Sequence, residues 1–152
     1  MGLSNIFEIT GSALNAQSIH INVIAGNMAN SQTTSGSEAG AYRARRPVFA
    51  SVMASSMGSL ALGRPMTANT STGSNVTGVR IDSFAESNTP IEQQLMPENP
   101  FADEDGYIYL SNVNMVEEMA FMMEASRSYQ ANIEVLNTSK ELMLRTLSMG
   151  AG

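Results

Sequence analysis

Residues 115–147 read MVEEMAFMMEASRSYQANIEVLNTSKELMLRTL, and their pattern decides the fold that we expect. Mostly apolar residues recur at alternating steps of four and three, which places them in one stripe along a helix. The stripe consists of Met115, Met119, Met122, Ser126, Tyr129, Ile133, Leu136, Lys140, Met143 and Leu147. An average spacing of 3.5 residues keeps one side of a helix against a partner helix along its whole length.

The residue before this stretch predicts where the helix begins. Asn114 can accept a hydrogen bond from the amide of Glu117, and the Glu117 carboxylate can reach back in a capping box. Six of the twelve methionines lie between Met115 and Met149. Flexible thioether side chains suit a helix that packs against several non-identical neighbours, although an ordinary core helix is the alternative.

The N-terminal end of the chain carries a matching stripe. Its members are Leu3, Phe7, Thr10, Leu14, Gln17, Ile21, Ile24 and Met28. They predict a first helix that begins between residues 2 and 4 and ends at about Ala29. A second apolar series runs beside the first and includes Ile6, Ile9, Ala13, Ala16, His20 and Val23. One partner helix cannot cover so wide an apolar face, so we expect this helix to depend on several partners.

The middle of the chain is different, because residues 42–110 contain all five prolines. We expect strands at 42–52, 75–84 and 107–110, a turn at 104–106, and a Ser-, Thr- and Gly-rich loop at 53–74. The predicted fold is mainly α, with long N- and C-terminal helices forming a coiled coil and a small β-rich or irregular central segment. Its regions are an N-terminal axial helix at 1–30, a loop and small β-rich outer segment at 31–111, and a C-terminal axial helix at 112–152.

The charge content points toward protein partners. Charged residues make up 14% of the chain, below the roughly 25% of ordinary soluble domains. Only eight residues are basic and the net charge is −6, so nucleic-acid binding is excluded. Ten acids and no bases lie between Asp82 and Glu124. We interpret this acidic stretch as solvated surface, with a docking face for a basic partner as the alternative.

The sequence contains no set of residues for catalysis or metal binding. His20 is the only histidine and cysteine is absent, so a His-based triad and a multi-His metal site are excluded. We expect His20 to be a packed helix residue. In a calcium loop with Gly106 at position six, Phe101 and Asn112 would stand where carboxylates are needed, so a turn is favoured. We therefore expect no enzyme activity, no metal and no cofactor.

Two further segments are absent from the sequence. No run of 18 apolar residues predicts a membrane-spanning helix. The N-terminal residues lack the basic leader, apolar core and small-residue cleavage site of a secretory signal peptide.

Both ends of the chain resemble a known family. Residues 9–17 (ITGSALNAQ) and 22–30 (NVIAGNMAN) resemble the N-terminal motif of bacterial flagellar rod and hook proteins. Residues 112–119 (NVNMVEEM) and 125–137 (ASRSYQANIEVLN) are similar to the C-terminal signature of the FlgC family, the proximal rod proteins of the flagellar basal body. The motif residues are Asn22, Ala25, Asn27, Ala29, Asn30, Asn112, Asn114, Glu118, Arg127, Tyr129 and Asn132.

The resemblance implies a structural subunit of the flagellar basal-body rod, the axial drive shaft that spans the periplasm. It implies polymerisation with copies of this chain and with other rod subunits, and no nucleic acid or small-molecule substrate. It also implies export through the flagellar type III apparatus without a cleaved signal peptide, and contact with that apparatus and its adaptor at the membrane ring. The expected assembly interface comprises Leu3, Phe7, Leu14, Ile21, Ile24, Met28, Met115, Met119, Met122, Tyr129, Ile133, Leu136, Met143 and Leu147.

Two alternatives stay open at this point. Another flagellar axial subunit would share the end motifs. A soluble ligand-binding module with a helical hairpin would use the central segment as its pocket.

Overall fold

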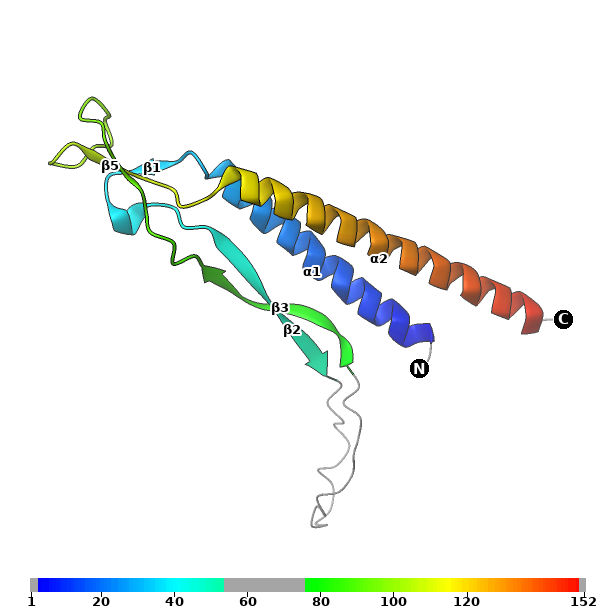
Figure 1. Cartoon of the computed structure of the whole chain (residues 1–152). Coiled ribbons are helices and arrows are strands. Elements are labelled where there is room, and N and C mark those ends of the chain that lie inside the picture. Colours follow the sequence, from blue (N-terminus) through cyan, green and yellow to red (C-terminus); the bar gives the residue numbers. More distant parts are fainter. Residues whose placement is uncertain (1–2, 54–75, 151–152) are drawn as a thin grey trace, which may run out of the picture.

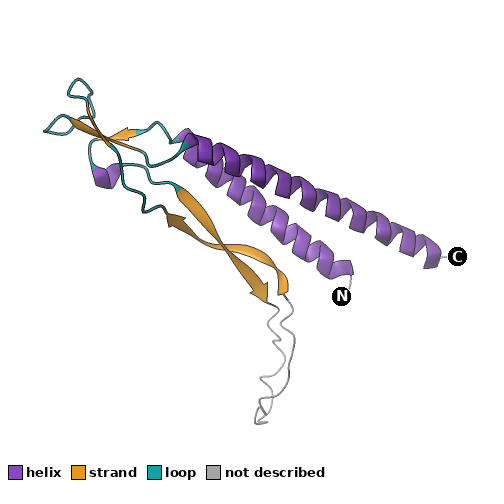
Figure 2. Ribbon diagram, in the orientation of Figure 1, coloured by secondary structure: helices purple, strands orange, loops and turns teal. Residues whose placement is uncertain are grey.

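Two antiparallel helices form the body of the molecule. The computed structural model describes residues 3–53 and 76–150, and it places both chain ends at the same end of an elongated molecule (Figure 1). Helix α1 (Leu3–Ala29) has 27 residues and helix α2 (Met115–Gly150) has 36. They lie side by side, a two-stranded ribbon runs along α1, and a small three-stranded sheet lies at the far end (Figure 2). The mainly helical fold class is therefore confirmed in its coarse form.

The ends of the helices agree with the sequence-based boundaries. Helix α1 ends at Ala29 because the following amides tighten into i to i−3 bonds: Asn30 donates to Asn27 at 3.1 Å and Ser31 donates to Met28 at 3.3 Å. The Asn30 side-chain Nδ2 also donates to the Gly26 carbonyl at 2.8 Å. Helix α2 begins after Asn114, whose Oδ1 accepts from the amides of Val116 and Glu117 at 3.0 and 3.4 Å. The Asn114 cap is confirmed. The prediction that the Glu117 carboxylate reaches back to Asn114 is wrong, since this carboxylate pairs with Arg46 instead.

Strands β2 (Arg45–Met53) and β3 (Val76–Glu86) pair antiparallel as a ribbon. The register pairs Arg45 with Glu86 and Met53 with Val76, with irregularities after Val48 and Val52. The predicted strand at 42–52 begins three residues late because the Ala44 amide donates to the Asn112 side chain and not to the neighbouring strand. The predicted loop lies outside the described residues except for Met53, which ends β2.

The three-stranded antiparallel sheet has the order β1 (Thr34–Ser35), β5 (Tyr107–Leu110) and β4 (Gln93–Leu95), and a short 3-10 helix, η1 (Glu38–Gly40), follows β1. Strand β5 has the predicted bounds. The predicted turn before it is confirmed, because Asp103 Oδ1 accepts from the amides of Asp105 and Tyr107 and Gly106 has a φ of 79°. A positive φ of this size favours glycine.

The hydrophobic core is small. Among the described residues, the buried apolar side chains are Ala16, Ile24, Ala41, Ala44, Ile108 and Ala125. Four of these six are alanines, which each remove little apolar surface from water. The fold is therefore held largely by helix contact, ribbon pairing and a few buried polar groups.

Candidate assembly surface

The seam between the helices uses a different stripe of α2 from the one expected. Glu118, Ala125 and Ser139 are buried, and Asn132 between them is half-buried, so small or polar residues recur every seven positions. Alternating with them are Met122, Tyr129 and Leu136, which are half-buried. The other half of the predicted stripe, Met119, Ile133 and Leu147, is exposed by 48%, 38% and 64%. The predicted stripe therefore matches the seam with α1 at Met122, Tyr129 and Leu136, whereas Met119, Ser126 and Lys140 lie one residue beyond the buried positions. The small side chains among those buried positions let the two backbones approach closely.

The wide face of α1 is covered within the chain. Toward α2, Gln17 Nε2 donates to the carbonyl of Ala125 at 3.2 Å, and Thr10 and Ile24 are buried. Toward the ribbon, the His20 ring makes an edge contact with Phe49 at 5.6 Å between centroids. The expectation that one helix cannot cover this face is confirmed, and the second partner in this structure is the chain's own ribbon.

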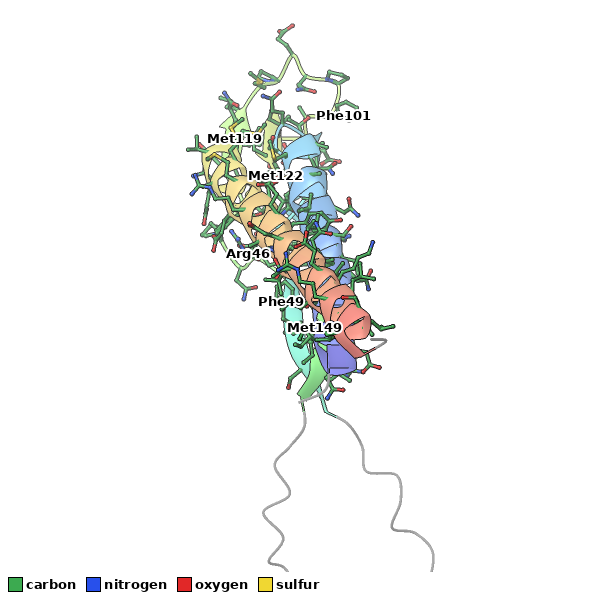
Figure 3. All side chains as sticks on the ribbon, turned by 90° about the vertical axis from the view of Figure 1, so that its right-hand side faces the viewer. Arg46, Phe49, Phe101, Met119, Met122 and Met149 are labelled. Carbon is green, nitrogen blue, oxygen red and sulfur yellow. The ribbon has the colours of Figure 1, made fainter. Side chains whose placement is uncertain are left out.

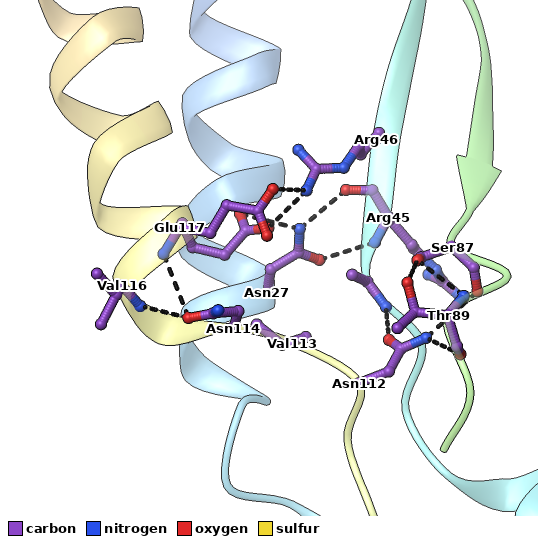
Figure 4. Close-up of polar contacts among 12 residues, drawn as sticks. Asn27, Arg45, Arg46, Ser87, Thr89, Asn112, Val113, Asn114, Val116 and Glu117 are labelled. Atoms are coloured by element: carbon purple, nitrogen blue, oxygen red, sulfur yellow. Dashed lines mark hydrogen bonds and ion pairs between the residues drawn. The ribbon is translucent and has the colours of Figure 1, made fainter. Parts of the chain in front are cut away.

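A buried amide joins three elements at the closed end of the helix pair (Figure 4). Asn27 is 1% exposed, and its Nδ2 donates to Glu118 Oε2 on α2 at 3.2 Å and to the Arg45 carbonyl on β2 at 2.8 Å. Its Oδ1 accepts from the Arg45 amide and from the Tyr42 hydroxyl, both at 3.0 Å. Because every hydrogen-bonding site of this amide is used, Asn27 sets how α1, α2 and β2 meet.

The arginine cluster completes this junction. Arg46 Nη2 lies 3.4 Å from Glu117 Oε1 and 3.8 Å from the buried Glu118 Oε1, and its guanidinium stacks 4.4 Å above the Phe121 ring. Arg45 pairs with Glu86 and Arg43 with Glu38. Each of the three arginines therefore has an acidic partner within the chain.

Asn112 ties the small sheet region to the ribbon. Its Oδ1 accepts from the Ala44 amide at 2.7 Å, and its Nδ2 donates to the carbonyls of Ser87 and Thr89 at 3.3 and 2.9 Å. Three separate chain segments therefore meet at one side chain just before α2 starts. Asn27, Asn112 and Glu118 were expected as motif residues with no assigned role, and their contacts give each a structural one.

Helix α2 carries two exposed apolar flanks on either side of the seam. One flank comprises Val116, Met119, Met123, Ile133, Leu144 and Leu147, exposed by 38–76%. The other follows Phe121 and comprises Val135, Leu142 and Met149, exposed by 49%, 52% and 83%. Between the flanks, on the side away from α1, lie charged residues including Glu124, Arg127, Glu134 and Glu141. A helix with apolar residues on three sides is suited to burial among several helices.

The predicted interface residues divide into covered and uncovered sets. Ile24 is buried, and Phe7, Leu14, Ile21, Met28, Met115, Met122, Tyr129 and Leu136 are half-buried. Met119, Ile133, Met143 and Leu147 are exposed, and the side chain of Leu3 lies outside the described residues. Among the motif residues, Asn22, Ala25, Ala29 and Arg127 are exposed, whereas Asn132 and Asn30 are half-buried. Sequence reasoning missed the exposed Val116, Met123, Val135, Leu142, Leu144 and Met149.

The chemistry of the grooves offers little to a ligand. A groove of about 400 Å³ between α1, α2 and β2 is lined by His20, Arg46, Phe49 and Phe121. Burial lowers the pKa of His20, with Glu118 acting in the opposite direction, so its ring is neutral near pH 7. In the described ranges, every buried side-chain nitrogen and oxygen has a hydrogen-bond partner, so no buried group is left to receive a ligand.

Metal sites and membrane-spanning helices are both absent from the described residues. Within residues 3–53 and 76–150, no three His, Cys, Asp or Glu side chains are grouped so that they could hold a metal ion. None of the described helices combines the length and apolar character that crossing a membrane requires.

Comparison with known proteins places these features in a family. Residues 7–36 match the family described as flagella basal body rod protein, and residues 104–149 match the flagellar basal body rod FlgEFG protein C-terminal family. The first match covers most of α1 and contains Asn27, and the second covers nearly all of α2 and contains Glu118.

Whole-chain relatives agree. The chain is 43% identical over 150 residues to the flagellar basal-body rod protein FlgC of Escherichia coli O157:H7, covering 99% of each chain. The FlgC protein of Salmonella typhimurium is also 43% identical, with the same coverage. The FlgC protein of Buchnera aphidicola from Acyrthosiphon pisum is 39% identical over 98% of each chain.

Proposed function

This chain belongs to the FlgC family of flagellar basal-body rod proteins, and from that premise we propose that its terminal helices polymerise with neighbouring subunits into an axial drive shaft. The similarity over the whole chain is the observation that carries the function, since it makes the protein a structural subunit of the rod. No catalytic role is proposed.

The apolar flanks of α2 support polymerisation. In the seam, α1 and α2 pair as a two-stranded coiled coil within one subunit, and the described residues leave both flanks of α2 exposed. Covering a fully exposed Val, Leu, Ile or Met side chain contributes about 1.5–3 kcal/mol, so the nine apolar side chains of the two flanks form a strong drive toward assembly. Each flank then packs against a helix of an adjacent subunit.

The three regions divide the work of the subunit. The N-terminal axial helix (1–30) and the C-terminal axial helix (112–152) build the shaft, and the outer segment (31–111) makes lateral contacts. The partners are copies of this chain, other rod subunits, and the type III export apparatus with its adaptor at the membrane ring. The rod spans the periplasm, and the subunit reaches it through that apparatus without a cleaved signal peptide.

Substitution of exposed flank residues tests this function. Leu144→Asn together with Leu147→Asn removes two apolar side chains of one flank that are 60% and 64% exposed, so the subunit's own fold loses little packing. In the native host, with the wild-type copy deleted, we expect no rod incorporation and no swimming. Incorporation is measured by immunoblot of isolated basal bodies.

The matched control uses neighbouring residues on the charged side. Glu134→Gln with Glu141→Gln changes exposed groups on the same helix and keeps the apolar flanks intact. This control should incorporate and swim normally. Normal incorporation of the flank variant would contradict the proposal.

A further inference from the structure

An exposed apolar patch occupies the tip of the small sheet, at the opposite end of the molecule from the chain termini. Phe101 lies at the tip and Met149 near the end of α2 (Figure 3). Four exposed apolar residues of β4, β5 and the loop between them, here called the tip patch, are Leu95, Met96, Phe101 and Tyr107, exposed by 60%, 42%, 61% and 39%. Leu95 and Tyr107 are direct partners in the register of β4 and β5, so their side chains lie on the same face of the sheet. The patch lies outside both terminal helices, so polymerisation through the helices does not account for it.

The backbone under the tip patch is held in place by hydrogen bonds. The Met96 amide donates to Gly106 at 2.9 Å, and the Asp103 amide donates to Tyr107 at 2.9 Å. The Asn99 side chain accepts from the Phe101 amide at 3.0 Å. The carbonyl of Phe101 also lies against Gly36, where a Cβ would come within 2.9 Å of it. Since the loop is already ordered, binding through the tip patch would cost little conformational entropy.

The rim of the tip patch is negatively charged. Glu98, Glu104 and Asp105 are exposed within the same loop. The ion pairs of the described residues all involve other acids: Glu38, Asp82, Glu86, Glu117 and Glu118. The rim carboxylates therefore face solvent without a cation from the described part of their own chain. An apolar centre with a charged rim is the usual composition of a protein–protein interface.

Another copy of the chain offers no matching cation cluster within its described residues. Its grouped arginines are already paired with acids, as is Arg80 with Asp82. The remaining described cations, Arg127, Lys140 and Arg145, are spread along α2 and interleaved with Glu134 and Glu141. Over 13 residues of helix, Arg127 and Lys140 are separated by about 20 Å. A rim of three carboxylates needs a denser basic surface than this.

We propose that the tip patch docks on a basic surface of a different basal-body protein, with apolar side chains at its centre and Lys or Arg around them. The location in the basal body rests on the proposed function, but the charge argument does not. The docking joins unlike proteins, whereas the flanks of α2 join similar helices. This chain therefore has two interfaces of different chemistry at different ends.

The absence of cysteine makes a direct test possible. Phe101→Cys introduces a single thiol into the chain, which is then labelled with a benzophenone maleimide in isolated basal bodies and irradiated. We expect crosslinking to one other protein, at a peptide with Lys or Arg beside the attachment point, identified by mass spectrometry. Crosslinking to this chain itself, or to a peptide without basic residues, would overturn the proposal, as would no crosslink.

Two controls separate charge, incorporation and fold. The first control adds Glu98→Gln, Glu104→Gln and Asp105→Asn to Phe101→Cys, and this loss of the rim charges should abolish the crosslink. The second control adds Ser83→Lys, Ala85→Lys and Asn88→Lys instead. These make the same change in net charge on β3 and just beyond it, so the crosslink should be kept. Retention in the first set would contradict the charge argument. Tyr107→Cys replaces Phe101→Cys if the latter is not incorporated. Absence of the unmodified chain from basal bodies would refute the proposed function alone.

Discussion

At the residue scale, buried polar groups hold the elements of this protein together, as apolar residues usually do in larger proteins. Asn27 lies on α1 between α2 and β2, and its side-chain amide makes four hydrogen bonds. A buried polar group costs free energy when it lacks a partner, so the bonds define one arrangement of the three elements. The family motif at the ends of the chain therefore includes residues that orient the elements of a single subunit.

The first prediction concerns this amide. Asn27→Ala removes the hydrogen bonds to the Arg45 backbone groups, the Tyr42 hydroxyl and Glu118 Oε2, while Glu118 Oε1 keeps its ion pair with Arg46. The substitution should lower the free energy of unfolding by about 3 kcal/mol. Asn22→Ala, at an exposed position on the same helix, should change it by less than about 0.5 kcal/mol. Urea unfolding followed by circular dichroism measures both, with trimethylamine N-oxide present to favour the folded state. Equal effects of the two substitutions would contradict the assigned role.

At the element scale, α1 depends on the ribbon as much as on α2. Ser12 Oγ accepts from the Val79 amide of β3 at 3.0 Å and donates to the Ile9 carbonyl of its own helix at 2.8 Å. Gly78 is buried against this side chain. The absence of a side chain at residue 78 is what lets the strand approach the helix so closely.

The second prediction uses two glycines at this contact. Gly78→Ala places a Cβ that would overlap Ser12 Oγ, so the ribbon must move away from α1 and the protein should lose about 1–3 kcal/mol of stability. Gly11→Ala has no heavy atom within 4 Å of the new Cβ and lies inside a helix, so it should gain about 0.5–1 kcal/mol. The same urea titration measures both changes. Stabilisation by Gly78→Ala would refute the close approach.

At the scale of the whole molecule, the helices differ in length and α2 extends beyond α1. Helix α2 spans about 54 Å and α1 about 40 Å, so the last turns of α2 have no partner among residues 3–53 and 76–150. Every residue from Lys140 to Gly150 is exposed, and this segment includes Leu142, Leu144, Leu147 and Met149. Isolated helical turns without tertiary contacts are marginal in water.

The third prediction follows from this overhang. In the free chain, amides of residues 143–150 should exchange with deuterium almost as fast as in an unfolded peptide, and those near Ala125 and Asn132 more slowly. In isolated basal bodies the same C-terminal amides should become protected by at least about a hundredfold, since assembly covers them. Hydrogen exchange with mass spectrometry compares the two states. Unchanged exchange at 143–150 would show that the overhang stays uncovered in the rod.

How far the sequence predicts the structure depends on the length of each pattern. The two long helices and strand β5 follow from periodicity, capping and turn residues, because these signals depend on near neighbours. Strands β1 and β4 were missed, since they have two and three residues and no alternation to detect. The seam on α2 was misplaced because Glu118, Asn132 and Ser139 are polar or small, and hydrophobicity alone favours Met119 and Ile133. The recurrence of small or polar residues every seven positions, from Glu118 to Ser139, was the signal that could have located the seam.

The sequence by itself determined the helices, the wide apolar face of α1, the absence of histidine and cysteine clusters, and the family. Those properties depend on residue identity and spacing along the chain. Only the tertiary structure decided which stripe of α2 meets α1, that the ribbon covers the other side of α1, and that apolar side chains collect at the tip. Residues far apart in the chain, such as Asn27 and Glu118, must first be brought together, and hydrogen-bond satisfaction and close approach of small side chains then select the face.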